Sequence, residues 1–177
     1  KKTLLIDLDL RKPKVHLGMD VNNDLGMSNL LVDQCGIDEV VRHSHIEGFD
    51  FITAGPIPPN PSELILGKNF KNTIEKLKSH YDTIIIDTPP VGLVSDGVSV
   101  LSEVDIPIYV FKANYSKRQF VSNVFNLTKK ENITNLNVIL NGVKKSQNSY
   151  GYGYHGYYID EEHNQKSIFK RLFSKWK

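Results

Sequence analysis

Three short stretches of this sequence are continuously apolar, and they constrain its fold more than any other feature. They are residues 4–6 (Leu-Leu-Ile), residues 84–86 (Ile-Ile-Ile) and residues 108–110 (Ile-Tyr-Val). A strand with solvent on one face alternates apolar and polar residues, whereas a strand covered on both faces is apolar throughout. The three stretches therefore predict a parallel sheet with helices on both faces.

Segments with helical spacing separate the predicted strands. One begins at Ser62 and continues to Leu77 unless Gly67 breaks it, a second covers about 116–130, and a shorter one follows Ser95. Alternating strands and helices predict an α/β fold of three layers with a mainly parallel sheet, whose ligands bind at the carboxyl ends of the strands. The predicted strands are residues 3–8, 49–53, 83–86, 106–111 and 137–140.

Length and composition limit the class of protein. The chain has 177 residues, 40% hydrophobic and 24% charged, with a net charge of +2 and one cysteine. These values fit one soluble globular domain and exclude collagen-like, disordered and disulfide-scaffold proteins. No run approaches the roughly 20 apolar residues that cross a bilayer, so we expect a soluble, cytosolic segment. Residues 166–177 have a net charge of +5, whereas residues 1–165 have a net charge of −3, which disfavours a nucleic-acid binder that is basic throughout.

Acidic residues stand at the ends of two predicted strands. Asp7 and Asp9 follow the first apolar stretch, and Asp87 follows the three isoleucines. An ionised carboxylate beside buried apolar residues is costly unless a cation or a donor offsets it. Asp7 and Asp9 are two residues apart, which in an extended strand places both on one side. The acids indicate a site for a metal or a metal-bound phosphate; a turn or helix cap is the alternative for each one alone.

Three motifs, in order, resemble those of the bacterial tyrosine kinases, the BY-kinase family of capsule and exopolysaccharide synthesis. Residues 5–13 (LIDLDLRKP) resemble the Walker A′ motif, residues 84–90 (IIIDTPP) the Walker B motif, and residues 55–64 (GPIPPNPSEL) the proline-rich loop between them. The resemblance implies the P-loop NTPase fold of the deviant Walker type, shared with partitioning ATPases. It also implies ATP and Mg²⁺ as cofactors and transfer of phosphate to tyrosine.

The resemblance assigns roles to single residues. Asp7 and Asp9 match the Walker A′ acids, with Asp7 expected to take the tyrosine proton and to hold the hydration shell of Mg²⁺. Asp87 matches the Walker B partner of the metal. Asn141 matches an asparagine that reads adenine in related ATPases, because its amide both donates and accepts. Arg11 is expected to steady phosphates or a neighbouring subunit, and an exposed surface arginine is the alternative.

One family motif does not occur in the 177 residues. They contain no Gly-x-x-x-x-Gly-Lys-Ser/Thr loop, which supplies the backbone donors, the lysine and the Mg²⁺-binding hydroxyl that hold the phosphates. In the family this loop lies just upstream of Walker A′. We therefore expect residues 1–147 to be the later part of a P-loop kinase domain, truncated before Walker A′, and this segment alone to be inactive.

Tyrosines are concentrated near the end of the chain. Residues 148–159 alternate tyrosine with glycine and lack the spacing of a core element. The resemblance implies a flexible autophosphorylation cluster modified in trans, whereas composition alone fits an adhesive or stacking role equally well. Each phosphate would add about −1.5 to −2 charges, which could switch subunit assembly. The predicted phosphoacceptors are Tyr150, Tyr152, Tyr154, Tyr157 and Tyr158.

Residues 160–177 have the pattern of a basic amphipathic tail. Ile168, Leu172 and Trp176 are spaced at i, i+4 and i+8 among basic residues, and no acidic residue occurs in 166–177. A helix of this kind could lie on an anionic membrane surface. It could equally pack on its own or a neighbouring domain.

These features favour an ATP-dependent protein-tyrosine autokinase that regulates capsule or exopolysaccharide polymerisation and export. The resemblance implies a ring-like homo-oligomer at the cytoplasmic face of the bacterial inner membrane. It also implies two partners: a membrane activator or polysaccharide co-polymerase domain, fused or separate, and a tyrosine phosphatase. The alternatives are a non-catalytic assembly subunit of the same fold and a partitioning-type ATPase. The tyrosine cluster favours the kinase over the ATPase, because hydrolysis of ATP alone needs no acceptor arm.

Overall fold

The structure of the protein is a computed structural model, and it describes residues 1–90, 96–130 and 133–143. The tyrosine cluster at 148–159 and the basic tail at 160–177 lie outside the described residues. The predictions made for these two segments are therefore carried forward as proposals.

A four-stranded sheet forms the centre of the fold, in the order β2-β3-β1-β4. β1 (Thr3–Asp7) lies between β3 (Phe49–Ile52) and β4 (Thr83–Asp87) and is parallel to both, which confirms the predicted parallel sheet. The short edge strand β2 (Arg42–His43) runs antiparallel to β3. The three parallel strands therefore bring their carboxyl ends to the same edge of the sheet.

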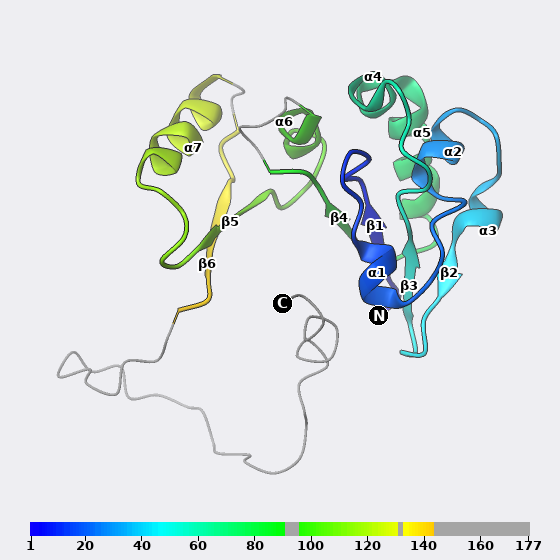
Figure 1. Ribbon diagram of the computed structural model, residues 1–177. Helices are drawn as coiled ribbons and strands as arrows, with labels where there is room; N and C mark the ends of the chain where they lie inside the picture. Colours follow the sequence, from blue (N-terminus) through cyan, green and yellow to red (C-terminus); the bar gives the residue numbers. More distant parts are fainter. Residues whose placement is uncertain (91–95, 131–132, 144–177) are drawn as a thin grey trace, which may run out of the picture.

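Helices cover this sheet and close its core (Figure 1). Three short helices lie in the connection between β1 and β3: α1 (Val15–Met19), α2 (Met27–Leu31) and α3 (Ile37–Val40). Two further helices, α4 (Pro61–Leu66) and α5 (Lys68–Lys78), connect β3 to β4. The core cluster joins strand and helix side chains, among them Leu4, Ile6, Leu8, Met27, Leu30, Ile52, Phe70, Ile74 and Leu77.

The long helix predicted after Ser62 is divided in two at Gly67. Gly67 ends α4 and precedes α5 with extended backbone angles, so it interrupts the helical hydrogen bonding there. Within α5 the apolar side chains Phe70, Ile74 and Leu77 are buried. The residue before the first helix is Asn60 rather than Ser62, and Pro61 occupies the first turn, where a missing N–H costs nothing.

A second, two-stranded parallel sheet contains β5 (Ile108–Lys112) and β6 (Asn137–Asn141). α7 (Gln119–Lys130) connects the two strands, and α6 (Asp96–Leu101) precedes them. Figure 1 shows this pair of strands set apart from the four-stranded sheet. Among the described residues no strand pairs with the outer edge of β4 or of β5.

The prediction that both faces of every apolar strand are covered is wrong for β4 and β5. In β4 the side chain of Ile85 is 49% exposed, and in β5 that of Val110 is 57% exposed. These strands are outermost in their sheets within the described part of the chain. The neighbouring described elements therefore bury only part of the apolar side chains of β4 and β5.

Candidate functional site

Asp7 and Asp87 end two neighbouring parallel strands in the same register. The N–H of Leu8 donates to the carbonyl of Asp87 at 2.8 Å, so the backbones stay joined where both strands end. Register partners on adjacent parallel strands point to the same face of a sheet, and their strands are about 4.8 Å apart. The sheet therefore places Asp7 and Asp87 side by side at its carboxyl edge.

Asp7 is fully buried, and three backbone N–H groups hold its carboxylate. Its Oδ1 accepts from the N–H of Asp9 at 3.1 Å, and its Oδ2 accepts from the N–H groups of Lys14 at 3.3 Å and Val15 at 3.1 Å. Burial raises the pKa of Asp7 above its ordinary value, although these three donors act in the opposite direction. The loop after β1 thus fixes both oxygens of a buried acid.

Asp87 differs from Asp7 because no group among the described residues donates to its carboxylate. Partial dehydration raises the pKa of Asp87 to about 6, and the negative charges of Asp7 and Asp9 contribute to the increase. Its side chain still has access to solvent at the end of β4. An acid that is crowded by other acids and accessible from outside is suited to receive a cation.

Asp9 lies beyond the strand, because β1 ends at Asp7. The expectation that Asp7 and Asp9 point the same way along one extended strand is therefore wrong. The Asp9 carboxylate accepts from the N–H groups of Arg11 at 3.3 Å and Lys12 at 3.0 Å, which forms a turn. For Asp9 the structure shows the turn that the sequence left as an alternative, while its charge still acts on Asp87.

Arg11 connects the loop after β1 to the start of α4. Its Nη2 donates to Oγ of Ser62 at 2.9 Å, across 51 positions of sequence. Ser62 lies in the proline-rich loop of residues 55–64, within which Nδ2 of Asn60 donates to Oε2 of Glu63 at 2.7 Å. The A′-like and proline-rich segments therefore meet in space, as their proposed common function requires.

Gly26 and Gly55 allow two loops at the carboxyl end of β3 to approach closely. A Cβ on Gly26 would lie 2.2 Å from the carbonyl oxygen of Thr53 and 2.4 Å from the nitrogen of Gly55. Gly55 has φ of +79°, and Asn23 binds its N–H at 2.9 Å and its carbonyl at 2.7 Å. This contact positions the beginning of the proline-rich loop, and sequence analysis missed it.

Asn141 lies at the end of β6, paired in register with Lys112 of β5. Its carbonyl accepts from the N–H of Ala113 at 2.8 Å, and its side chain is exposed. It therefore belongs to the two-stranded sheet, whereas Asp7, Asp9 and Asp87 belong to the four-stranded one. No contact among the described residues joins Asn141 to these acids.

The donor set fits a Mg²⁺ ion that brings most of its own ligands. Mg²⁺ prefers oxygen ligands and usually keeps several waters, with one or two carboxylates and substrate phosphates completing its shell. Asp87 offers an unbonded carboxylate, and Asp7 offers a buried one held by backbone donors. The described residues contain no group of three metal-ligating His, Cys, Asp or Glu side chains.

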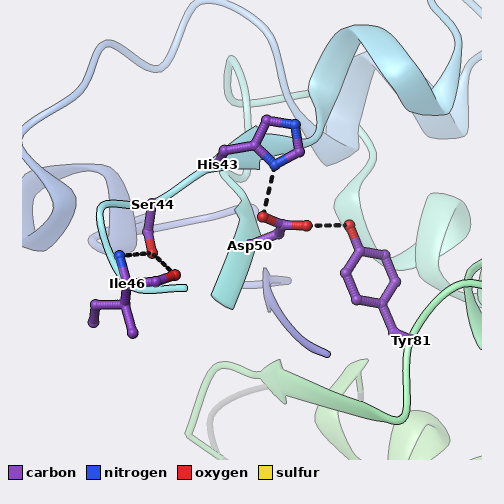
Figure 2. Close-up of polar contacts among 5 residues, drawn as sticks. All are labelled: His43, Ser44, Ile46, Asp50 and Tyr81. Atoms are coloured by element: carbon purple, nitrogen blue, oxygen red, sulfur yellow. Dashed lines mark hydrogen bonds and ion pairs between the residues drawn. The ribbon is translucent and has the colours of Figure 1, made fainter. Parts of the chain in front are cut away.

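A second polar cluster lies on β2, near the amino end of β3 and just before β4; Figure 2 shows its contacts. The carboxylate of Asp50 is buried, with Oδ1 at 2.7 Å from Nδ1 of His43 and Oδ2 accepting from the hydroxyl of Tyr81 at 2.8 Å. Dehydration alone would raise the pKa of Asp50, but these two hydrogen bonds lower it below its ordinary value. Burial and the neighbouring Asp50 carboxylate raise the pKa of Tyr81 to about 12. Sequence analysis missed this cluster, because its members are distant in the chain.

Comparison with known proteins agrees with the fold. An open α/β sheet binds its ligands at the carboxyl ends of the strands, where these acids lie, and the solved kinase domain described below assigns the fold to the P-loop NTPase class. The AAA domain family matches residues 1–140. The chain is 36% identical over 155 residues to the "Putative tyrosine-protein kinase CapB" of Staphylococcus aureus, and the matched region covers 88% of this chain and 68% of CapB. The chain belongs to the AAA domain family and to the family of bacterial tyrosine-protein kinases.

Two further comparisons show how much of a relative the chain represents. It is 34% identical to tyrosine-protein kinase YwqD of Bacillus subtilis over 88% of this chain and 65% of YwqD. The solved kinase domain of Escherichia coli tyrosine kinase ETK is 36% identical, with a TM-score of 0.76 over 86% of this chain and 60% of that chain. The 177 residues thus span about two thirds of these relatives.

None of the helices in the described ranges has the length and apolar character needed to span a bilayer.

Proposed function

We propose that this chain is part of an ATP- and Mg²⁺-dependent protein-tyrosine autokinase that regulates capsule or exopolysaccharide polymerisation and export. Its relatives are named tyrosine-protein kinases, and the observation that carries the proposal is the Asp7–Asp87 pair at the carboxyl edge of the sheet. Phosphoryl transfer needs little covalent chemistry from the protein. It needs a positioned metal and stabilisation of charge, and both follow from acids placed in this way.

The two acids differ in their surroundings, which supports different roles. Asp87 is accessible and receives no donor from the described residues, so it is the acid that would hold the hydrated Mg²⁺. Bound Mg²⁺ would bridge phosphate oxygens of ATP and offset their negative charge. Asp7 is buried, and its backbone donors keep the carboxylate oriented, so it would accept the proton of the attacking tyrosine.

Asp9, Arg11 and Asn141 have supporting roles in this proposal. Asp9 shapes the turn after β1 and adds negative charge beside Asp87. Arg11 fixes the proline-rich segment through Ser62 and carries positive charge beside the phosphate site. Asn141 would read adenine, which requires the β5–β6 sheet to lie against the carboxyl edge of the four-stranded sheet in the nucleotide-bound kinase.

The kinase also needs a phosphate-binding loop, a motif that does not occur in the 177 residues. Such a loop connects a strand to a helix, and its backbone N–H groups hold the phosphates. Within the described residues, the edge of β4 next to Asp87 has no strand partner, and Ile85 on this strand is 49% exposed. A strand that pairs with β4 would bring its loop to Asp87 and bury this isoleucine.

The acceptors and partners complete the proposal. Tyr150, Tyr152, Tyr154, Tyr157 and Tyr158 would be phosphorylated by a neighbouring subunit of a ring-like homo-oligomer. A membrane activator or co-polymerase domain, fused or separate, would hold the kinase at the cytoplasmic face of the inner membrane. A tyrosine phosphatase would reset the cluster.

The test is the intact mass of the gene's whole product after incubation with Mg·ATP and then with a tyrosine phosphatase. We expect added phosphates that map to residues 150–158 and disappear with the phosphatase. Asp7→Asn and Asp87→Asn should each lower the rate by about 100-fold or more, because each removes a charge that acts in the transition state. Asp38→Asn, on the exposed surface of α3, is the matched control.

Two outcomes would contradict the proposal. Phosphorylation of Asp87→Asn at the wild-type rate would show that the reaction does not depend on the paired acids. An unmodified mass despite bound ATP would instead favour the partitioning-type ATPase or the non-catalytic assembly subunit, and release of phosphate from ATP would distinguish these two.

A further inference from the structure

A hollow of about 770 Å³ lies between α7 and one face of the β5–β6 sheet. Figure 1 shows α7 alongside these strands. Phe111 of β5 and its register partner Leu140 of β6 lie on this face of the sheet. The apolar residues that line the hollow, called here the α7 groove, are Phe111, Val121, Val124, Phe125, Leu136, Val138 and Leu140.

The α7 groove is an unusually exposed apolar surface. Val121 and Phe125 of α7 are 52% and 64% exposed, and Val138 and Leu140 of β6 are 55% and 57% exposed. Isolated apolar side chains are common on protein surfaces, but large ones gathered on two facing elements indicate that another segment covers them.

Charge differs between the two ends of the groove. Lys112, Lys117 and Arg118 line it at the carboxyl end of β5. At the other end lies Leu136, whose neighbour Asn135 donates from its side chain to the carbonyl of Asp105 at 2.8 Å. Asp105 is exposed, so the groove runs from a basic end towards an acidic one.

We propose that residues 160–177 of the same chain occupy the α7 groove, with Ile168, Leu172 and Trp176 against its apolar walls. The proposal does not depend on kinase activity. It assigns a binding site to the basic amphipathic tail and a partner to the exposed face of α7.

The path of the chain supports this occupant. β6 ends at Asn141, opposite Lys112, so the chain leaves the sheet beside the basic end of the groove. About 25 residues then separate Val143 from Ile168, and a flexible coil of this length spans about 25–30 Å on average. Residues tethered at this distance reach millimolar effective concentrations, so modest apolar contacts suffice for docking.

The order of charges in the tail matches the order in the groove. Asp160, Glu161 and Glu162 come first, Lys166 lies between them and Ile168, and the other four basic residues lie among or after the apolar ones. If Asp160, Glu161 and Glu162 contact Lys117 and Arg118, the basic end of the tail points towards Asp105. In helical geometry residues 168–176 extend about 12 Å, close to the roughly 13 Å spanned by a five-residue strand such as β5.

Docking would also restrain the tyrosine cluster. Residues 148–159 would form a loop closed at β6 on one side and at the groove on the other. Such a closed loop restricts how far each tyrosine can travel from its own subunit. Release of the tail would therefore extend the reach of the tyrosines.

Trp176 is the only tryptophan of the chain, so its fluorescence reports on the tail directly. In the 177-residue protein without lipid, at concentrations below those at which the open strand edges associate, we expect a blue-shifted emission relative to the urea-unfolded chain, unchanged on further dilution. Phe125→Glu places a charge in the groove and should return the emission to that of an exposed indole. Ile57→Glu is the matched control, because Ile57 is 65% exposed on a loop away from α7.

A charge exchange tests the orientation without changing the apolar contacts. Lys117→Glu with Arg118→Glu should shift the emission towards the exposed value, because Asp160, Glu161 and Glu162 would then face like charges. Changing these three acids to lysine in the same protein should restore the blue shift. Lys117 and Arg118 are both exposed, so their substitution leaves the core intact.

Four results would overturn the proposal. The first is an exposed emission in the wild-type protein that shifts only with phosphatidylglycerol vesicles, which indicates a membrane-bound tail. The second is a blue shift lost on dilution, which indicates docking on a second copy. The third is a blue shift that persists in Phe125→Glu, and the fourth is no rescue by the charge exchange.

Discussion

Asp87 is the register partner of Asp7 in the neighbouring parallel strand, and the two acids do not experience the same environment. Backbone N–H groups bind both oxygens of Asp7, whereas the Asp87 carboxylate has no donor among the described residues. Dehydration, reinforced by the charges of Asp7 and Asp9, raises the pKa of Asp87 to about 6. One register pair therefore contains a fixed acid and an acid that still needs a cation.

Asp87→Asn should stabilise the metal-free chain at neutral pH. A carboxyl whose pKa is raised on folding favours the fold while it is protonated, and this contribution is lost as pH rises from 3.8 through about 6. Asparagine has no ionisable group, so Asp87→Asn avoids this loss of folding stability above pH 6. Each pKa unit corresponds to about 1.4 kcal/mol, and solvent access reduces the gain to about 1 kcal/mol at pH 7.

Urea unfolding at pH 7 and pH 4 measures this effect. The difference in unfolding free energy between Asp87→Asn and the wild-type chain should be present at pH 7 and shrink towards zero at pH 4, where the folded Asp87 carboxyl is protonated. Asp38→Asn on α3 serves as the control. A variant that is less stable than wild type at pH 7 would contradict the assigned repulsion.

Tyr81→Phe should destabilise the fold, because it removes a donor from the buried Asp50 carboxylate. A lost hydrogen bond to a buried charged group costs about 1.5–3 kcal/mol. The pKa of Asp50 is lowered on folding, so its stabilisation is present above 3.8 and is lost as pH falls through the folded pKa. The deficit of the variant should therefore be full at pH 7 and decrease under more acidic conditions.

Thermal unfolding as a function of pH provides the measurement for Tyr81→Phe. Tyr115→Phe is the matched control, since Tyr115 is 76% exposed. An equal loss in both variants, or a loss that does not change with pH, would show that the Tyr81 hydroxyl does not act through Asp50.

Gly26→Ala should be much more damaging than Gly36→Ala. The Cβ of the first would meet backbone atoms of Thr53 and Gly55 at 2.2 and 2.4 Å, so the two loops must separate. At Gly36 the nearest atom is a flexible Glu39 oxygen at 3.4 Å. Overpacking costs about 1–3 kcal/mol, which chemical unfolding resolves. Equal stability of the two variants would mean that the loop contact contributes little.

The Arg11–Ser62 hydrogen bond should give a small, measurable coupling. Arg11→Met and Ser62→Ala, alone and combined, form a double-mutant cycle. Because the bond is exposed, we expect a coupling of about 0.5 kcal/mol in unfolding free energy. Arg11→Met with Ser44→Ala, a serine that bonds to Ile46 instead, is the control pair and should be additive. A coupling of zero for Arg11 and Ser62 would leave the two segments joined by packing alone.

The elements that sequence predicted well are those with a strong local pattern. The isoleucines of β4 and the apolar spacing of α5 needed no tertiary information, and Gly67 marked the break between α4 and α5. By contrast, α1, α2 and α3 have five residues or fewer, too short for a period of 3.6 to be visible. Their positions depend on loops such as Asn23–Gly55 that only the fold brings together.

The sequence was sufficient to predict that Asp7 and Asp87 would be neighbours, but not the contacts that surround them. Asp7 and Asp87 follow apolar strands, and parallel pairing makes such positions neighbours. The turn at Asp9 depends on where β1 ends, and the Arg11–Ser62 bond crosses 51 positions of sequence, so neither has a local signal. Placing Asn141 at the same site from sequence assumed one continuous sheet, whereas the described residues form two.

The open edges of β4 and β5 also govern how this chain behaves in a test tube. Within the described part of the chain each edge presents unpaired backbone groups, flanked by exposed side chains such as Ile85, Ile108 and Val110. Apolar edges of this kind act as templates for strand addition between molecules. The isolated 177-residue chain should therefore aggregate as its concentration rises, and a peptide strand that caps either edge should act as its solubiliser.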